Sequence, residues 1–541
     1  MSGYPASMQE SIRNLERTRE FRLKQEIPRL PFAARETLLH TYHPDYSPDA
    51  NVAVRLGPNK GQKLTTKLVE LLESKGRIDP DKIDLTKIAY DVDVLVIGGG
   101  GGGVSAALLA HENGAKVLLA SKLRIGDSNT MMAEGGIAAA TSPIDSLDKH
   151  FLDTLGGGRF KNKRDVINAL VHDAPLIVKW LKDLGAMFDT YPNGDIVVSF
   201  AGGQQCKRVH SCKDMSGKEF MRVVRDELYN KEIPVLEFAP AIELLKDDEG
   251  ICSGAILLNL ETNQYQIVKA KAVIMATGGC GRLHPNNFPT TNHYGATADG
   301  LVLAYRAGAN LLNMEAIQYH PTGAMWPHQM LGHLITEACR GHGAHLVNKN
   351  GDRFINELET RDTVSSANLR EVQERGNGIK TPMGTEGIWL DTPLINIRAD
   401  AGKLDRMFAG IVRRFHEYHI DVRKEPILIF PSQHYQNGGI EMDPDARTCV
   451  PGLYSAGECS GGVQGINRLG GNSLSDIFVF GRRGGINAAE FARSRKVGQL
   501  SLQHIKDYHS ELDKLGIDTG LKCPLLLPDY MRAEVKETLL V

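Results

Sequence analysis

The feature that most constrains this chain is a run of six glycines at 98–103, which separates an apolar segment from an alanine-rich one. Residues 92–97 are mostly branched and apolar, as in a buried strand, and the residues after the glycines are typical of a helix. A second apolar run follows at 117–120. This order predicts a strand, a tight turn, a helix and a second strand, which places a helix N-terminus against a bound pyrophosphate.

Within the run, Gly98, Gly100 and Gly103 have the GxGxxG spacing. The first glycine permits the sharp turn, the second lets backbone N–H groups approach a pyrophosphate, and the third allows helix and strand to pack closely. A flexible loop is the alternative, but the flanking strand and helix patterns disfavour it. Ser121 ends the second strand, where nicotinamide-binding folds carry an acidic residue. We therefore predict dinucleotide binding with no preference for nicotinamide.

Composition excludes several classes of protein. A net charge of −2 over 541 residues gives no reason to expect nucleic acid or an anionic membrane as a partner. No stretch of about 18 apolar residues occurs, and residues 9–24 are polar and charged, so we expect a cytoplasmic protein, peripheral to a membrane only through a partner. Eight cysteines, none before Cys206, are typical of reduced thiols. Cys206 and Cys212 have no further ligand nearby, so we expect no metal site.

The chain also changes character along its length. Glycine-rich, strand-like sequence gives way near 318 to segments with histidine, arginine and glutamate, and it returns at 438–471. A strand–helix fold interrupted by an inserted domain explains this better than tandem domains do. The predicted parts are an N-terminal extension packed on the body or on a partner (1–88), a dinucleotide-binding domain in two parts (89–317 and 431–490), a capping domain (318–430) and a short C-terminal region (491–541).

Four polar clusters lie in the second half of the chain: Gln318–Gly323, Thr336–Gly341, Thr360–Asp362, and His434-Tyr435 with Asn467–Ser473. Each alone is explained by a capped helix, a salt-bridged arginine or a histidine bonded to backbone. Together, two histidines, two or three arginines and a Thr–Glu pair suit a small dicarboxylate. Arginine binds a carboxylate through two parallel charge-assisted bonds, and histidine and threonine add single donors.

These clusters belong to an ordered series of motifs that resembles the flavoprotein subunit of the succinate dehydrogenase/fumarate reductase family. The motifs are VIGGGGGG, SNTMMAEGGIAAA, MATGGCGR, ATADG, QYHPTG, TEACRGHGAHLVNKNGDR, TRD, HYQNGGI and GLYSAGECSGGVQGINRLGGNSLSDIFVFGR. They span roughly three quarters of the chain, from about Val92 to Arg482. The resemblance implies an α/β fold, with a Rossmann-like FAD-binding domain interrupted by an inserted α+β capping domain and preceded by an N-terminal extension.

The resemblance also implies an FAD-dependent oxidoreductase and assigns residues to its cofactor. The FAD residues would be Gly98, Gly100, Gly103, Ser121, Ser128, Asn129, Thr130, Gly135, Gly136, Thr277, Gly278, Gly279, Asp299, Glu458, Ser473 and Leu474.

For the reaction, the resemblance implies reversible reduction of fumarate to succinate. Four residues would hold the substrate carboxylates: His320, Thr336, His434 and Arg468. Hydride would leave flavin N5 for one alkene carbon while Arg361 protonates the other. Glu337 and Arg340, three residues apart on one helical face, would relay protons to it. Arginine has a pKa above about 12, so it can donate only in a closed site with such a relay.

The chain departs from the family pattern in several places. Membrane-bound members carry FAD covalently on the histidine of a Ser-His-Thr triplet, whereas this chain has Ser128-Asn129-Thr130, so we expect non-covalent FAD and a bias towards fumarate reduction. The chain after Phe480 is shorter than in those members, so a partner subunit is less expected to dock as it does in the family. The segment from His320 to Glu337 is longer than usual, which affects the placement of Thr336.

An iron–sulfur subunit is the partner that the resemblance implies, as the source of electrons. Two other functions stay open. L-aspartate oxidase is a soluble relative with non-covalent FAD, but it tends to have Ala-Ser where this chain has Gly470-Gly471. A non-catalytic FAD electron carrier would tolerate loss of the histidines and arginines, all of which are present here.

Overall fold

The central sheet carries the glycine turn. The computed structural model describes residues 3–527. β4 (Ile88–Ile97) pairs in parallel with β5 (Val117–Ala120) on one side and β12 (Gln264–Met275) on the other. The sheet order is β22, β10, β11, β12, β4, β5, β9, and β20 pairs in parallel with β12. The other bounds are β9 (Val235–Leu236), β10 (Ala241–Asp247), β11 (Cys252–Asn259), β20 (Leu453–Ser455) and β22 (Leu500–Ser501).

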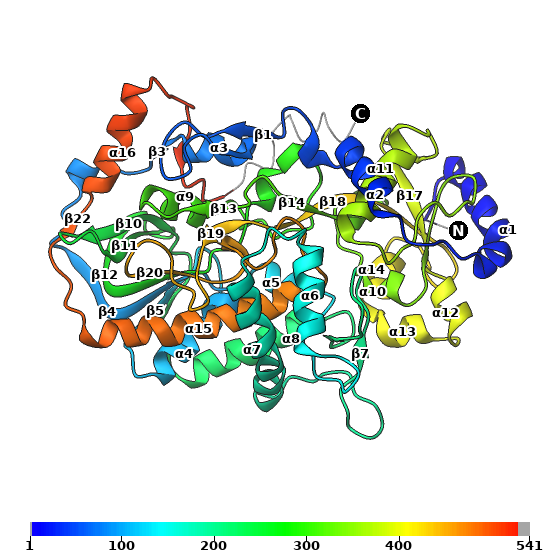
Figure 1. Ribbon diagram of the computed structural model, residues 1–541, viewed down its shortest axis with the longest axis horizontal. Coiled ribbons are helices and arrows are strands. Elements are labelled where there is room, and N and C mark those ends of the chain that lie inside the picture. Colours follow the sequence, from blue (N-terminus) through cyan, green and yellow to red (C-terminus); the bar gives the residue numbers. More distant parts are fainter. Residues whose placement is uncertain (1–2, 528–541) are drawn as a thin grey trace.

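Both faces of this sheet are buried. Val94 and Val96 of β4 belong to one hydrophobic cluster, and Leu95 and Ile97 belong to another on the opposite face. Continuous apolar strands of this kind are typical of parallel sheets covered on both sides. The first cluster contains residues of α4 (Gly101–Glu112), α7 (Arg164–Asp183), α8 (Ser216–Asn230) and α15 (Asn472–Ser494), and the second contains residues of α3 (Thr66–Leu72) and α9 (Asp299–Arg306). Figure 1 shows α15 running along one side of the sheet.

The inserted segment forms a second, mostly antiparallel sheet. Its order is β14 (Ile317–Ala324), β18 (Ile427–Gln436), β17 (Glu386–Asp391) and β15 (His345–Val347), and β16 (Ile379–Lys380) pairs with β17. Its helices are α10 (Ala338–Gly341), α11 (Arg361–Gln373), α12 (Leu394–Arg398), α13 (Lys403–Met407) and α14 (Ala409–His416). After this segment the chain returns to the first sheet as β20. The predicted α/β fold with an interrupted FAD-type domain is confirmed, and the domain bounds stay our proposal.

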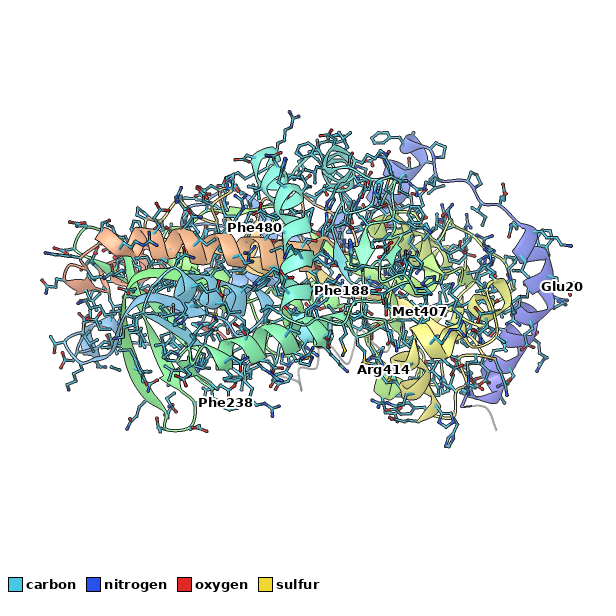
Figure 2. All side chains as sticks on the ribbon, turned by 90° about the horizontal axis from the view of Figure 1, so that it is seen from below. Glu20, Phe188, Phe238, Met407, Arg414 and Phe480 are labelled. Carbon is cyan, nitrogen blue, oxygen red and sulfur yellow. The ribbon has the colours of Figure 1, made fainter. Side chains whose placement is uncertain are left out.

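Figure 2 shows the two units side by side, with Phe480 on α15 in one and Met407 and Arg414 of the capping segment in the other. The remaining elements are α1 (Gln9–Lys24), α2 (Phe32–Tyr42), β1 (Asn51–Ala53), β2 (Lys63–Thr65), β3 (Lys75–Gly76), α5 (Asn129–Met132), β6 (Ile137–Ala138), α6 (Leu147–Gly157), β7 (Val198–Ser199), β8 (Val209–His210), β13 (Leu311–Leu312), β19 (Gly439–Glu441), β21 (Ser460–Gly461), α16 (Gln503–Lys514) and β23 (Lys522–Cys523). Within residues 3–527 no helix is long and apolar enough to cross a membrane.

The N-terminal segment packs on the body, which is one of the two positions that the sequence left open. Met8, Ile12 and Leu15 lie in the hydrophobic cluster of the capping segment. Farther along, Leu68 and Leu72 of α3 lie in a cluster of the central sheet. Figure 1 shows the same division, with α1 at the far end of the capping segment and α3 over the first sheet. The segment therefore spans both units.

A buried ion pair fixes α1 to the capping sheet. The Arg22 side chain is 1 % exposed, and its Nη2 lies 2.8 Å from Oδ2 of Asp391, a fully buried side chain at the end of β17. Arg19 contacts the other carboxylate oxygen at 2.9 Å. Removing Arg22 leaves the buried Asp391 carboxylate with Arg19 as its remaining partner, and partial loss of a buried charge network is destabilising.

We therefore predict that Arg22→Ala lowers the free energy of unfolding by about 3 kcal/mol. Arg17→Ala, at an exposed position of the same helix, should change it by less than about 0.5 kcal/mol. Chemical denaturation followed by tryptophan fluorescence measures both values. Equal stability of the two variants would contradict the assignment.

Candidate active site

The glycine turn has the geometry that its spacing predicts. Gly98 has a φ of +126°, which residues with side chains rarely adopt, and a Cβ there would lie 2.1 Å from the Ala276 carbonyl oxygen. A Cβ on Gly103 would lie 1.9 Å from the Gly98 carbonyl oxygen. The turn is therefore closed against β12 and against the start of α4, with no room for side chains.

A long cavity begins at this turn, and most of the residues predicted to bind the cofactor line it. Those that do are Gly98, Gly100, Ser121, Ser128, Asn129, Thr130, Thr277, Gly278, Asp299, Glu458, Ser473 and Leu474. They come from the ends of β4, β5 and β12, from the starts of α5, α9 and α15, and from the turn after β20. The structure thus brings together residues that are more than 370 positions apart in the sequence.

Gly103, Gly135, Gly136 and Gly279 do not line the cavity. Three of them permit close packing instead: Gly103 in the turn, Gly136 with a φ of +148° beside the His210 carbonyl, and Gly279 against the Glu458 carboxylate. Gly135 is exposed, and a Cβ there would meet no atom within 4 Å. Nothing in the structure connects Gly135 with a ligand.

Several other residues that line the cavity were not predicted from the sequence. Lys122 follows Ser121 directly, so its position next to a motif was a usable signal. Pro240, Leu334 and the segment 291–293 stand in no nucleotide-binding motif and reach the cavity only through the fold. Tyr435 was noted for its cluster but not for the cofactor.

The lining fits a dinucleotide. Glycine backbone and the N-terminus of α4 stand at one point, as a pyrophosphate requires. Thr277 lies at the cavity wall directly after β12, beside Gly278. Lys122 Nζ donates to Asp299 Oδ2 and to the Thr297 hydroxyl, both at 2.7 Å, which orders the lining beside the turn. Bound here, FAD would have donors for its phosphates.

Asn129 stands in the cavity wall with both polar atoms engaged. Its Nδ2 donates to Glu458 Oε2 at 2.9 Å, and its Oδ1 accepts from the backbone N–H of His293 at 2.7 Å. Burial raises the pKa of Glu458, and the bond from Asn129 lowers it in part. The asparagine therefore links two segments of the cavity wall.

The predicted catalytic residues form one buried cluster. Arg361 Nε donates to Glu337 Oε2 at 2.6 Å, and Arg340 Nη2 lies 3.8 Å from the same oxygen. Gln318 Oε1 accepts from Arg361 Nη1 at 3.1 Å and from Arg468 Nη2 at 3.0 Å. One amide oxygen therefore holds two guanidinium groups together. Gln318 was part of a predicted cluster but had no predicted role.

Two histidines connect this cluster with the cavity. The rings of His320 and His434 have centroids 4.9 Å apart, and His434 also lines the cavity. The Thr291 hydroxyl lies 2.6 Å from Nδ1 of His434. Thr336 is 2 % exposed and follows Ile335, whose N–H donates to the Thr322 carbonyl at 3.0 Å. The longer loop therefore returns to β14, and Thr336 stays beside the cluster.

Burial and charge set the protonation states of this cluster. Burial alone would raise the pKa of Glu337, but Arg361 and Arg340 outweigh it and hold the pKa at about 2. Burial, followed by the charge of Arg361, lowers the pKa of Arg468 to about 9. Burial also lowers the pKa of both histidines well below the usual value, and neighbouring arginines lower it further. At neutral pH Glu337 and Arg468 are charged, and the imidazoles are neutral.

Comparisons with known proteins agree with this geometry. A family model described as an FAD binding domain matches residues 93–474. A protein of Methanothermobacter marburgensis, named as part of a fumarate reductase (CoM/CoB), is 37 % identical over 77 % of this chain and 77 % of its own length. L-aspartate oxidase of Streptomyces coelicolor is 34 % identical over 76 % of this chain and 70 % of its own. Among solved structures, a variant of E. coli quinol fumarate reductase FrdA has a TM-score of 0.71 at 33 % identity, covering 79 % of this chain and 74 % of that one.

The glycine turn gives a direct test of the cavity. We predict that Gly103→Ala opens the turn, because the added Cβ would lie 1.9 Å from the Gly98 carbonyl oxygen, and that purified protein loses most of its flavin. Gly156→Ala is the control, since a Cβ there meets no atom within 4 Å. The ratio of flavin absorbance to protein absorbance measures the occupancy. Full flavin content in Gly103→Ala would contradict the role of the turn.

Proposed function

This chain belongs to the FAD-binding flavoproteins of the succinate dehydrogenase/fumarate reductase family and is an FAD-dependent oxidoreductase, and on this basis we propose that it reduces fumarate to succinate, reversibly. The observation that carries the proposal is the charge of the buried cluster. Arg340, Arg361 and Arg468 supply three positive charges, whereas Glu337 is the carboxylate that two of them face, with Glu357 and Glu458 acting on Arg340 and Arg468 respectively, so positive charge is in excess around the cluster. A dicarboxylate dianion neutralises it, and buried charges are tolerated only when they are compensated.

The arrangement suits two carboxylates. Arg468 and His434 would bind one of them, through a charged fork and a single neutral donor. Thr336 and His320 would bind the other. Arg468 is itself fixed by Ser473, whose hydroxyl accepts from Nη1 at 2.8 Å, and by Tyr435, whose ring centroid lies 4.5 Å from the guanidinium carbon. The substrate would therefore meet a preorganised guanidinium.

The FAD that these residues would hold would, in its reduced form, supply a hydride to one alkene carbon. Arg361 would give the proton to the other carbon, because it is the guanidinium of the cluster that lies directly against a carboxylate. A proton lost from Arg361 would be replaced through Glu337 and Arg340. Glu337 is held by the backbone N–H of Gly202 and by Arg361, so the relay is fixed in place before substrate binds. Water is excluded, since each of these side chains is at most 9 % exposed.

The source of electrons is also part of the proposal. Similar proteins of Methanothermobacter marburgensis and Escherichia coli are named as single subunits of fumarate reductases. We infer that this chain takes electrons from a separate iron–sulfur protein, which would place it at a membrane only through that partner. Oxidation of L-aspartate is the competing function, because an L-aspartate oxidase is among the similar proteins. L-aspartate is therefore the control substrate.

We predict that Arg361→Ala keeps its FAD and still binds dicarboxylates, but loses about 10²–10⁴-fold in fumarate reduction. The loss should appear in kcat, because the proton moves only in the transition state. Arg468→Ala should instead raise KM as well, since a carboxylate anchor acts in both the ground and transition states. Steady-state assays with a reduced dye separate the two. Wild-type kcat in Arg361→Ala would refute the proposal. So would wild-type oxidation of L-aspartate with the oxidised dye that is faster than reduction of fumarate with the reduced dye.

A second prediction concerns the flavin linkage. The amide nitrogen of Asn129 is delocalised into its carbonyl and already donates to Glu458, so it cannot form the bond that a histidine forms. Acid precipitation should therefore release all the flavin into the supernatant. Without the covalent substituent the flavin should have a lower potential, so fumarate reduction should be faster than succinate oxidation. Yellow colour in the washed pellet, or the opposite order of rates, would contradict these two statements respectively.

A further inference from the structure

Part of the N-terminal segment contacts the loop that precedes Arg361, the proposed proton donor. Residues 25–46, which we name the brace, precede the part of the chain that matches the family model. The brace contains α2, which packs beside α11. Arg361 is the first residue of α11, so the start of this helix sets the position of its guanidinium group.

Two hydrogen bonds join the brace to the loop that precedes Arg361. Asn356 Nδ2 donates to the Ile27 carbonyl at 2.8 Å, and the Leu30 N–H donates to Glu359 Oε1 at 2.6 Å. Glu359 is 3 % exposed and stands two residues before Arg361. A buried carboxylate without its donor is costly, so this contact is specific rather than incidental.

A third contact lies on the other side of Arg361. Arg159 bridges Glu36 of the brace, at 2.9 Å, and Asp362, at 2.8 Å. Asp362 also accepts from the N–H of Thr363 at 2.7 Å, within the first turn of α11. The Arg159 backbone has a φ of +56°, which is rare for a residue with a side chain and is retained only where surrounding contacts impose it.

The brace also reaches the strand opposite α11. Asp45 Oδ2 accepts from the N–H of Ile317 at 2.8 Å, at the first residue of β14. That strand carries Gln318, whose amide oxygen binds Arg361, and His320. Two of the elements that fix the Arg361 guanidinium, α11 and β14, therefore contact the brace.

We propose that the brace positions Arg361 for proton transfer, with Glu36 and Glu359 as its positioning residues. The proposal rests on the proposed function, since it concerns the residue that donates the proton. Reacting groups must lie within a few tenths of an ångström of their productive geometry, and a displacement of about 1 Å from a remote change costs up to about 10²-fold in rate. The brace contains no catalytic motif, but its contacts with the loop before Arg361 would raise kcat.

A matched pair of variants tests the contact at Glu359. Glu359→Leu removes the acceptor of the Leu30 N–H while keeping a side chain of similar size. We expect kcat for fumarate reduction to fall about 10-fold and KM to change by less than about twofold, with unchanged FAD content. The solvent deuterium isotope effect on kcat should rise, because proton transfer becomes slower. Glu359→Gln keeps the acceptor oxygen and should behave as the wild type. Equal kcat in the two variants, or a loss expressed in KM, would overturn the proposal.

A second pair keeps the test decisive if Glu359→Leu does not fold. Glu36 is partly exposed, and Glu36→Gln removes the charge that Arg159 contacts. This variant should also have a lower kcat than the wild type. Glu26→Gln is its control, since Glu26 is exposed in the same segment. Hydrogen–deuterium exchange of amides at 353–364 should be faster in Glu36→Gln than in Glu26→Gln, with 427–436 unchanged. Identical exchange and identical kcat in this pair would overturn the proposal.

Hydrogen–deuterium exchange also distinguishes failure of the proposed function from failure of the brace. If the wild-type chain reduces no fumarate, the proposed function fails, whereas exchange at 353–364 still reports whether the brace holds the loop. If the wild type is active and neither kcat nor exchange responds to these variants, only the brace fails.

Discussion

The uncompensated positive charge of the buried cluster is the constraint on which the rest of the site depends. Arg361 and Arg340 face one carboxylate, Glu337, and Gln318 joins Arg361 to Arg468 at the end of a cavity. Burying such an excess is unfavourable, so the fold must supply dipoles and the ligand must supply charge. Gln318 and the Gly202 N–H provide part of this stabilisation. In the proposed reaction, a bound dicarboxylate would supply the balancing negative charge.

The meeting of two folding units explains how this charge adjoins the cofactor. β14 and α11 of the capping segment bring Gln318, His320 and Arg361, whereas the start of α15 and the loop before it bring Arg468. The cavity lies mainly in the first unit and reaches His434 of the second, so the proposed cofactor and substrate residues meet at the boundary. Neither unit alone contains both sets of residues, so the proposed reaction would depend on the relative placement of the units.

Residues without side chains make this closeness possible. A Cβ on Gly470 would lie 3.2 Å from Glu337 Oε2 and 3.4 Å from Arg361 Nη2, and a Cβ on Gly202 would lie 2.9 Å from Glu337 Oε1. Larger residues would press on the ion pair or displace it. In the turn before α4, Gly98 and Gly103 likewise allow backbone segments to pack against each other.

The sequence alone determined the local chemistry, because it is written in short-range patterns. Strand, glycine turn and helix at 88–112 follow from apolar periodicity and from the conformational freedom of Gly98, and the motifs identified the polar clusters residue by residue. Only the tertiary structure decided which of these groups touch. Gln318 between two arginines, Asn129 between Glu458 and His293, and the brace against the loop before Arg361 all join segments that are distant in the chain. Such contacts depend on how the two sheets pack, which no local pattern encodes.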